Sequence, residues 1–206
     1  MKVFLILLGF GLLFGCDGEK SNETASEGSL DKQESAAEDI AKASVTVHSK
    51  PASLTPKQVA DLFAEDIGQW KVEGKNMPVG GDPESFEDTM EIRWKEEGKS
   101  TIATFSGMIN GEEFRFIGHK EYDTKEGEFI WRSKGEGLPE TSSRETYDPK
   151  KKTYHGKSSF PNGAEETSTF KVINENKRLF KAQVKVDGKL VFSREATLIR
   201  VEDDGC

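Results

Sequence analysis

Gly68-Gln69-Trp70 stands between two kinds of sequence in this chain of 206 residues. Before it, Thr55-Pro56-Lys57-Gln58 has the pattern of a helix start, because threonine can cap, proline suits the first helical position and glutamine completes a capping box. Val59, Leu62 and Phe63 then fall on one face of that helix. After it, apolar and polar residues alternate in segment after segment, which is the pattern of half-buried β-strands. We therefore expect a short helix that plugs one end of an all-β domain.

The first strand is predicted from about Gly68 to Lys75, and the two prolines and two glycines of Asn76 to Pro83 predict a loop after it. The clearest strand covers residues 86–95, where apolar residues and Asp88 share one face and charged residues the other. Turn signals then follow at strand-length intervals: Glu97-Gly98, Asn110-Gly111, Lys125-Glu126-Gly127, Asp148-Pro149, Asn162-Gly163, Asn174-Glu175-Asn176 and Asp187-Gly188. These signals predict about ten strands, each antiparallel to the next. A meander of this length is expected to close, because closure removes its exposed edges.

The two ends of this meander carry a further signal. Trp70 opens the first strand and Arg200 lies near the end of the last. This pairing resembles the one that closes one end of calycin barrels, the group that includes lipocalins and fatty-acid-binding proteins. The resemblance implies a closed or nearly closed up-and-down barrel with Gly68, Trp70 and Arg200 at its closed end. We expect the guanidinium to stack on the indole near the helix while it donates to strand carbonyls.

Two strand ends extend the resemblance. Gly118-His119-Lys120-Glu121-Tyr122-Asp123 and Thr146-Tyr147-Asp148 each precede a turn. They look like the repeated Tyr-Asp strand ends of an uncharacterised bacterial calycin-like family with an early Gly-x-Trp and a late Arg. The resemblance covers about residues 57–202. That family has no established common activity, so the resemblance implies architecture and no reaction.

The N-terminus predicts a membrane tether. Lys2 and the 12-residue apolar stretch from Val3 to Phe14 fit a secretory signal peptide over residues 1–15, too short for a comfortable transmembrane helix. Leu13-Phe14-Gly15-Cys16 resembles the lipobox of bacterial lipoproteins, in which the cysteine is acylated by fatty acids such as palmitate. An ordinary signal peptide with a chance cysteine is the alternative. We expect a protein of the bacterial envelope anchored through Cys16, with the choice between inner and outer membrane left open.

Composition separates the tether from the domain. Residues 16–54 contain no aromatic residue and an excess of acids, so a disordered acidic spacer is predicted before a barrel domain over residues 55–206. The formal net charge is −8, with Lys and Arg interleaved among Asp and Glu. This pattern offers no basic face and makes nucleic acid an improbable partner. Cys16 and Cys206 are the two cysteines, and their positions favour neither a structural disulfide nor a zinc site.

Few residues suggest catalysis or a cofactor. His48 falls in the spacer, and the alternation of their strands places His119 and His155 on the outer surface. The sequence contains no histidine or cysteine pair with metal-ligand spacing, no Gly-x-Ser-x-Gly and no phosphate-binding glycine loop. Its carboxylates are numerous and are expected to be exposed. We therefore expect neither a metal nor a cofactor, and an enzyme is the third of three hypotheses.

The barrel interior supports the first two hypotheses. Inward positions are rich in aromatic residues, and the same alternation turns Ser143, Glu145, Ser158, Glu166 and Ser168 inward. Buried polar groups need water, each other or a ligand. The first hypothesis is therefore a binding module for a small hydrophobic or amphiphilic ligand, in a cavity beneath the 76–83 loop lined by some of these residues: Trp94, Phe116, Phe129, Trp131 and, on its polar side, Glu145. The second is an envelope interaction module whose barrel core is solid, with an unknown protein partner.

Overall fold

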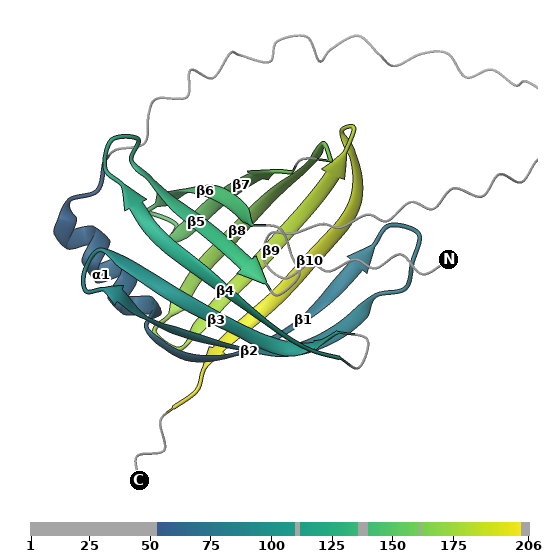
Figure 1. The fold of residues 1–206 in the computed structure, drawn as a ribbon, viewed down its shortest axis with the longest axis horizontal. Helices are drawn as coiled ribbons and strands as arrows, with labels where there is room; N and C mark the ends of the chain where they lie inside the picture. Colours follow the sequence, from purple (N-terminus) through teal and green to yellow (C-terminus); the bar gives the residue numbers. More distant parts are fainter. Residues whose placement is uncertain (1–52, 110–111, 136–139, 161, 203–206) are drawn as a thin grey trace, which may run out of the picture.

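The computed structural model describes residues 53–109, 112–135, 140–160 and 162–202. They form one closed barrel of ten antiparallel strands with a short helix at one end (Figure 1). The predicted all-β up-and-down barrel is confirmed. The elements are, in chain order, α1 (Pro56–Asp66), β1 (Gly68–Pro78), β2 (Glu84–Glu96), β3 (Ser100–Ile109), β4 (Glu112–Asp123), β5 (Glu128–Gly135), β6 (Thr141–Asp148), β7 (Thr153–Ser159), β8 (Ala164–Asn174), β9 (Lys177–Val186) and β10 (Lys189–Arg200).

The predicted signal peptide, the lipidation site Cys16, most of the spacer, and Cys206 lie outside the described residues. The one helix within the described part of the chain is too short to cross a membrane.

Closure of the barrel depends on β1, which pairs with β2 on one side and with β10 on the other. Each other strand pairs with its neighbours in sequence, so the strand order around the barrel is the order in the chain. The β9–β10 turn has the geometry expected of a tight hairpin, since Asp187 and Gly188 have φ values of 50° and 74°. Two successive positive φ values are what a type I′ turn requires.

The helix begins and packs as predicted. Thr55 and Gln58 form the complete capping box, and Pro56 is the first helical residue. Val59, Leu62 and Phe63 are buried against the end of the barrel. In Figure 1 the helix lies at the opposite end of the barrel from the β1–β2 loop.

The first strand is longer than predicted. We expected a loop from Asn76 to Pro83, but β1 continues to Pro78, which pairs with Phe192 of β10. Proline tolerates an extended backbone, and pairing resumes beyond it, where Val79 N donates to Val191 O at 3.0 Å. The connecting loop is therefore confined to residues 79–83.

Three groups of buried apolar residues fill the barrel. One, which includes Phe63, Phe129 and Tyr154, lies under the helix. A second contains Trp70 and Trp131 together with Val72, Met90 and Leu198. The third, which includes Phe160, Val184 and Phe192, lies where β7 to β10 approach the other end. The packing under the helix leaves the middle of the barrel as the place where a site can form.

Candidate functional site

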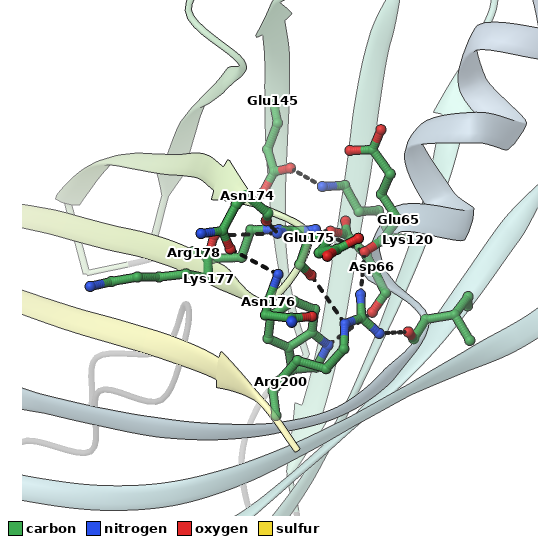
Figure 2. A network of polar contacts seen from close by, with 12 residues as sticks. Glu65, Asp66, Lys120, Glu145, Asn174, Glu175, Asn176, Lys177, Arg178 and Arg200 are labelled. Carbon is green, nitrogen blue, oxygen red and sulfur yellow. Dashed lines mark hydrogen bonds and ion pairs between the residues drawn. The ribbon is translucent and has the colours of Figure 1, made fainter. Parts of the chain in front are cut away.

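The helix end of the barrel is closed around Trp70. The indole Nε1 donates to Asp66 O at 2.9 Å, and the Arg200 guanidinium carbon lies 4.4 Å from the indole centroid. Arg200 also donates to the carbonyls of Glu65 at 2.7 Å, of Glu175 at 3.1 Å and of Ile67 (Figure 2). The contact predicted between Trp70 and Arg200 is therefore present, but the carbonyls that accept from Arg200 lie at the helix end and in the β8–β9 turn and not in strands. It satisfies carbonyls at the C-terminal end of the helix, which have no partner within the helix.

Gly68 makes this approach possible. Its φ is 134°, which side chains other than glycine rarely adopt, and a Cβ at this position would lie 2.5 Å from Arg200 Nη1. Any larger residue would therefore displace the guanidinium from the helix end as well as strain the backbone.

A second arginine lies against the same indole, and the sequence analysis missed it. Arg178 is completely buried, with its guanidinium carbon 4.8 Å from the Trp70 centroid. It donates to Glu65 O at 2.8 Å and pairs with Asp66 at 3.4 Å (Figure 2). Burial raises the pKa of Asp66, and the positive charges of Lys120 and Arg178 oppose that rise. Strand alternation could have indicated Arg178, because it shares the inward face of β9 with Phe180.

Beyond this closed end lies an internal cavity of about 120 Å³. One part of its wall is apolar: Val72, Met90, Ile92, Phe105, Trp131, Phe170, Phe180, Ala196 and Leu198. The other part is polar or carries glycine and tyrosine: Asp66, Asp88, Thr101, Lys120, Glu145, Tyr154, Gly156, Ser168 and Arg194. The cavity wall thus combines apolar side chains with polar and charged ones.

Lys120 and Glu145, which both line the cavity, form an ion pair. Lys120 Nζ lies 2.7 Å from Glu145 Oε2, and each side chain is 10% exposed. The contact is an ion pair without a hydrogen bond, since Glu145 Oε2 has no hydrogen-bond partner in the described part of the chain. Lys120 Nζ also lies 3.9 Å from the Tyr154 ring centroid. Burial, reinforced by nearby carboxylates, raises the pKa of Tyr154 well above its usual value. The Lys120 ammonium group is therefore in contact with both the Glu145 carboxylate and the face of the Tyr154 ring.

Asp88 and Arg194 form another internal pair. Arg194 Nη2 donates to Asp88 Oδ2 at 3.2 Å, and its guanidinium carbon lies 3.8 Å from the Phe86 ring centroid. Burial lowers the pKa of Arg194 to about 10 and raises that of Asp88, while each partner's charge opposes these shifts. Gly107 gives the carboxylate its place, since a Cβ there would lie 2.1 Å from Asp88 Oδ1.

A group of buried polar side chains without hydrogen-bond partners lies beside this wall. It consists of Ser143, Ser158 and Glu166, which are opposite one another on β6, β7 and β8. The hydroxyls of both serines and Glu166 Oε1 make no hydrogen bond to any described residue. Burial raises the pKa of Glu166 to about 8, helped by Glu145 and opposed by Arg194. Glu166 is therefore largely protonated at neutral pH.

Comparisons with known proteins agree with this architecture. No protein-family model and no curated protein sequence matches the chain. Among solved structures, the S-type phycobiliprotein lyase CPES from Guillardia theta is similar, at 11% identity over 73% of this chain and 100% of that one, with a TM-score of 0.54. Rv2717c from M. tuberculosis is similar at 12% identity over the same shares, with a TM-score of 0.53. The barrel is calycin-like.

This calycin-like barrel brings together only part of the predicted ligand site. Trp131 and Glu145 line the cavity, whereas Trp94, Phe116 and Phe129 do not. Trp94 and Phe129 instead pack on Phe63 of the helix, with ring centroids 6.3 and 5.5 Å apart. Because Phe63 of the helix packs against both rings, this part of the barrel wall contacts the helix and does not line the cavity.

Phe116 and the first loop are two further corrections. Phe116 stacks on Phe105 of the neighbouring strand, with ring centroids 4.8 Å apart, and it is Phe105 that faces the cavity. No residue of the 76–83 segment lines the cavity, and Val79 is 62% exposed. The 76–83 segment therefore takes no part in the wall of this cavity, and residues 76–78 instead pair with β10.

His119 and His155 do not line the cavity. His155 is exposed on β7, and His119 is half-buried on β4, where burial lowers its pKa. Within the described residues no three His, Cys, Asp or Glu side chains form a group that could hold a metal ion.

Proposed function

We propose that this protein is a membrane-tethered binding protein of the bacterial envelope whose barrel takes a small amphiphilic molecule. The observation that carries the proposal is the internal cavity, whose wall contains apolar side chains such as Phe105 and Leu198 together with the charged pairs Lys120–Glu145 and Asp88–Arg194. Such a wall suits a ligand with one apolar and one polar part, because each part meets its own kind of surface.

The volume limits the ligand. Sites for drug-sized molecules usually measure about 300–1,000 Å³, whereas this cavity measures about 120 Å³. An engineered apolar cavity of about 150 Å³ in another protein binds benzene. The apolar part of the ligand is therefore about the size of one ring or a short alkyl chain, unless the barrel wall moves.

The fold is compatible with this proposal. One similar barrel is named a phycobiliprotein lyase, which indicates that a barrel of this fold can act on another protein. The identity of 11% carries over no ligand and no reaction, and the proposal stands on the cavity.

The second candidate is an interaction module without a ligand. The packing of Phe63, Phe129 and Tyr154 favours it, because this end of the barrel is solid. The two candidates differ in whether a ligand contacts the polar side chains that line the cavity.

Mass spectrometry of small molecules extracted from the native protein tests the proposal. The protein is purified from membranes of its native cells as wild type, as Ala196→Leu and as Thr197→Leu. Ala196 lines the cavity, so leucine fills it, whereas Thr197 is the next residue of β10 and does not line the cavity. We expect one small amphiphile with the wild type and Thr197→Leu, and its loss with Ala196→Leu. Equal extracts from all three proteins would favour the interaction module.

A further inference from the structure

Among the described residues, the buried acidic groups of the barrel outnumber the buried basic groups. The described residues include four buried carboxyl groups and three buried cations: Asp66, Asp88, Glu145 and Glu166, with Lys120, Arg178 and Arg194. Each cation has its own carboxylate, at 3.4 Å for Arg178–Asp66, 2.7 Å for Lys120–Glu145 and 3.2 Å for Arg194–Asp88. Four acids against three bases leave one acid over, and the group left over is Glu166.

Glu166 does not line the cavity itself but lies next to residues that do. It faces inward on β8, two residues before Ser168, which lines the cavity. Its carboxyl group is close enough to Glu145 and Arg194, which line the cavity too, for both charges to act on it. Gly156, between Glu145 and Ser168 in the register, leaves room for the Ser168 hydroxyl, since a Cβ there would lie 2.3 Å from Ser168 Oγ.

Two hydroxyls complete the surroundings. Ser158 is the register partner of Glu166, and Ser143 is the partner of Ser158. Both hydroxyls and Glu166 Oε1 lack a partner among the described residues, although all three side chains are more than nine-tenths buried. Unpartnered buried polar atoms are rare because each costs about 1–3 kcal/mol. Three such atoms on adjacent strands indicate a place where a hydrogen-bonding group of a ligand can bind.

The charge of that group follows from the surplus acid. A carboxylate head would face Glu145 and Glu166, and the nearby cations already have partners. A protonated amine would supply the missing positive charge, and its N–H groups would donate to the carboxylate and to the serine oxygens. Its repulsion from Arg194 is reduced by Asp88, which pairs with that arginine at 3.2 Å.

We propose that the ligand carries a primary amine, which Glu166 binds as a carboxylate while Ser143 and Ser158 accept further hydrogen bonds. The inference rests on the proposed function, since the apolar part of the ligand occupies the 120 Å³ cavity. Binding of the ammonium ion requires Glu166 to be ionised. One proton is therefore released to solvent for each ligand bound at a pH below about 8, the pKa of Glu166 in the free protein.

Calorimetry with three probes tests the inference on the full chain. Benzylamine, benzyl alcohol and benzoate share one ring and differ in the head group. We expect benzylamine to bind at least tenfold more tightly than the other two at neutral pH. Its affinity should rise from pH 6 to pH 8, and titrations in buffers of different ionisation enthalpy should show release of one proton.

Variants locate the effect. Glu166→Gln should abolish both the preference for benzylamine and the proton release, and Ser158→Ala should weaken benzylamine several-fold. Glu165→Gln is the matched control, because Glu165 precedes Glu166 on the same strand and is exposed; it should behave as wild type.

The results separate this inference from the proposed function. Binding of benzyl alcohol or benzoate as tight as that of benzylamine would overturn the amine inference and leave the cavity function standing. The same holds if Glu166→Gln keeps the preference. Failure of all three probes to bind, with no molecule extracted from the native protein, would overturn both.

Discussion

Trp70 and Arg200 are direct register partners on β1 and β10, and the guanidinium of Arg200 lies 4.4 Å from the indole centroid. The same guanidinium donates to carbonyls at the end of the helix and to Glu175 in the β8–β9 turn. One side chain therefore joins the first strand, the last strand, a hairpin and the helix.

We predict that Arg200→Lys lowers the free energy of unfolding by about 1–2 kcal/mol. Lysine keeps the charge but loses the planar stack and cannot reach three carbonyls from one rigid group. Urea unfolding followed by tryptophan fluorescence measures the change. Arg115→Lys is the control, because Arg115 is exposed on β4, and it should be neutral. Equal stability of the two variants would contradict this role of Arg200.

The fold could be predicted because its signals are local. Alternation in residues 86–95, the Asp187-Gly188 turn and the Thr55–Gln58 capping box each act within a few residues, and each is found in the structure. The end of β1 could not be predicted in the same way. Pro78 looks like a loop residue until its partner, Phe192, is known, and that partner lies at the far end of the chain.

The site was less predictable because it depends on contacts between distant strands. Arg178, Lys120 and Arg194 all occupy inward positions, yet a charged residue in a strand is usually assigned to the surface. Their burial is explained by carboxylates on other elements, which alternation along one strand cannot identify. Glu145 was expected inside, but its partner Lys120 was not. The division of the aromatic residues between packing and cavity depended on where Phe63 inserts.

The Lys120–Glu145 pair predicts strong coupling. Lys120→Met leaves a buried carboxylate without its cation, and Glu145→Gln leaves a buried ammonium group without its carboxylate. Each change should therefore lower the free energy of unfolding by about 3–5 kcal/mol. The double variant should lose at least about 1 kcal/mol less than the sum of the two single changes. Urea unfolding of the four proteins gives this cycle. The exposed pair Lys181–Glu195, with N–O distance 2.6 Å, is the matched control and should couple by less than about 1 kcal/mol. Similar coupling in both pairs would argue against a special role for the internal one.

Glu166 predicts a dependence of stability on pH. Its pKa is about 8 in the folded protein against a usual value of 4.5, so the folded state holds a proton that the unfolded state has lost between these values. The contribution is therefore complete below pH 4.5 and is lost as the pH rises to about 8, by at most about 1.4 kcal/mol per pH unit. Unfolding curves across this range should show a steeper fall for wild type than for Glu166→Gln. Glu165→Gln should follow wild type, and parallel curves for all three proteins would place the Glu166 carboxyl in a more polar environment.

Cys16 carries the last prediction, which concerns the tether. The apolar leader ending in Leu13-Phe14-Gly15-Cys16 predicts that the cysteine becomes the acylated first residue of the mature chain. Several acyl chains anchor a protein stably, whereas one chain binds membranes marginally. Cys16→Ser should therefore move the protein from the membrane fraction to the soluble fraction, or leave the leader uncut at a higher mass. Fractionation and intact mass spectrometry measure both outcomes. Cys206→Ser removes the other cysteine and should leave mass and partition unchanged apart from the substitution itself. If Cys16→Ser behaves in the same way as Cys206→Ser, the leader is an ordinary signal peptide and the binding module is not anchored through this cysteine.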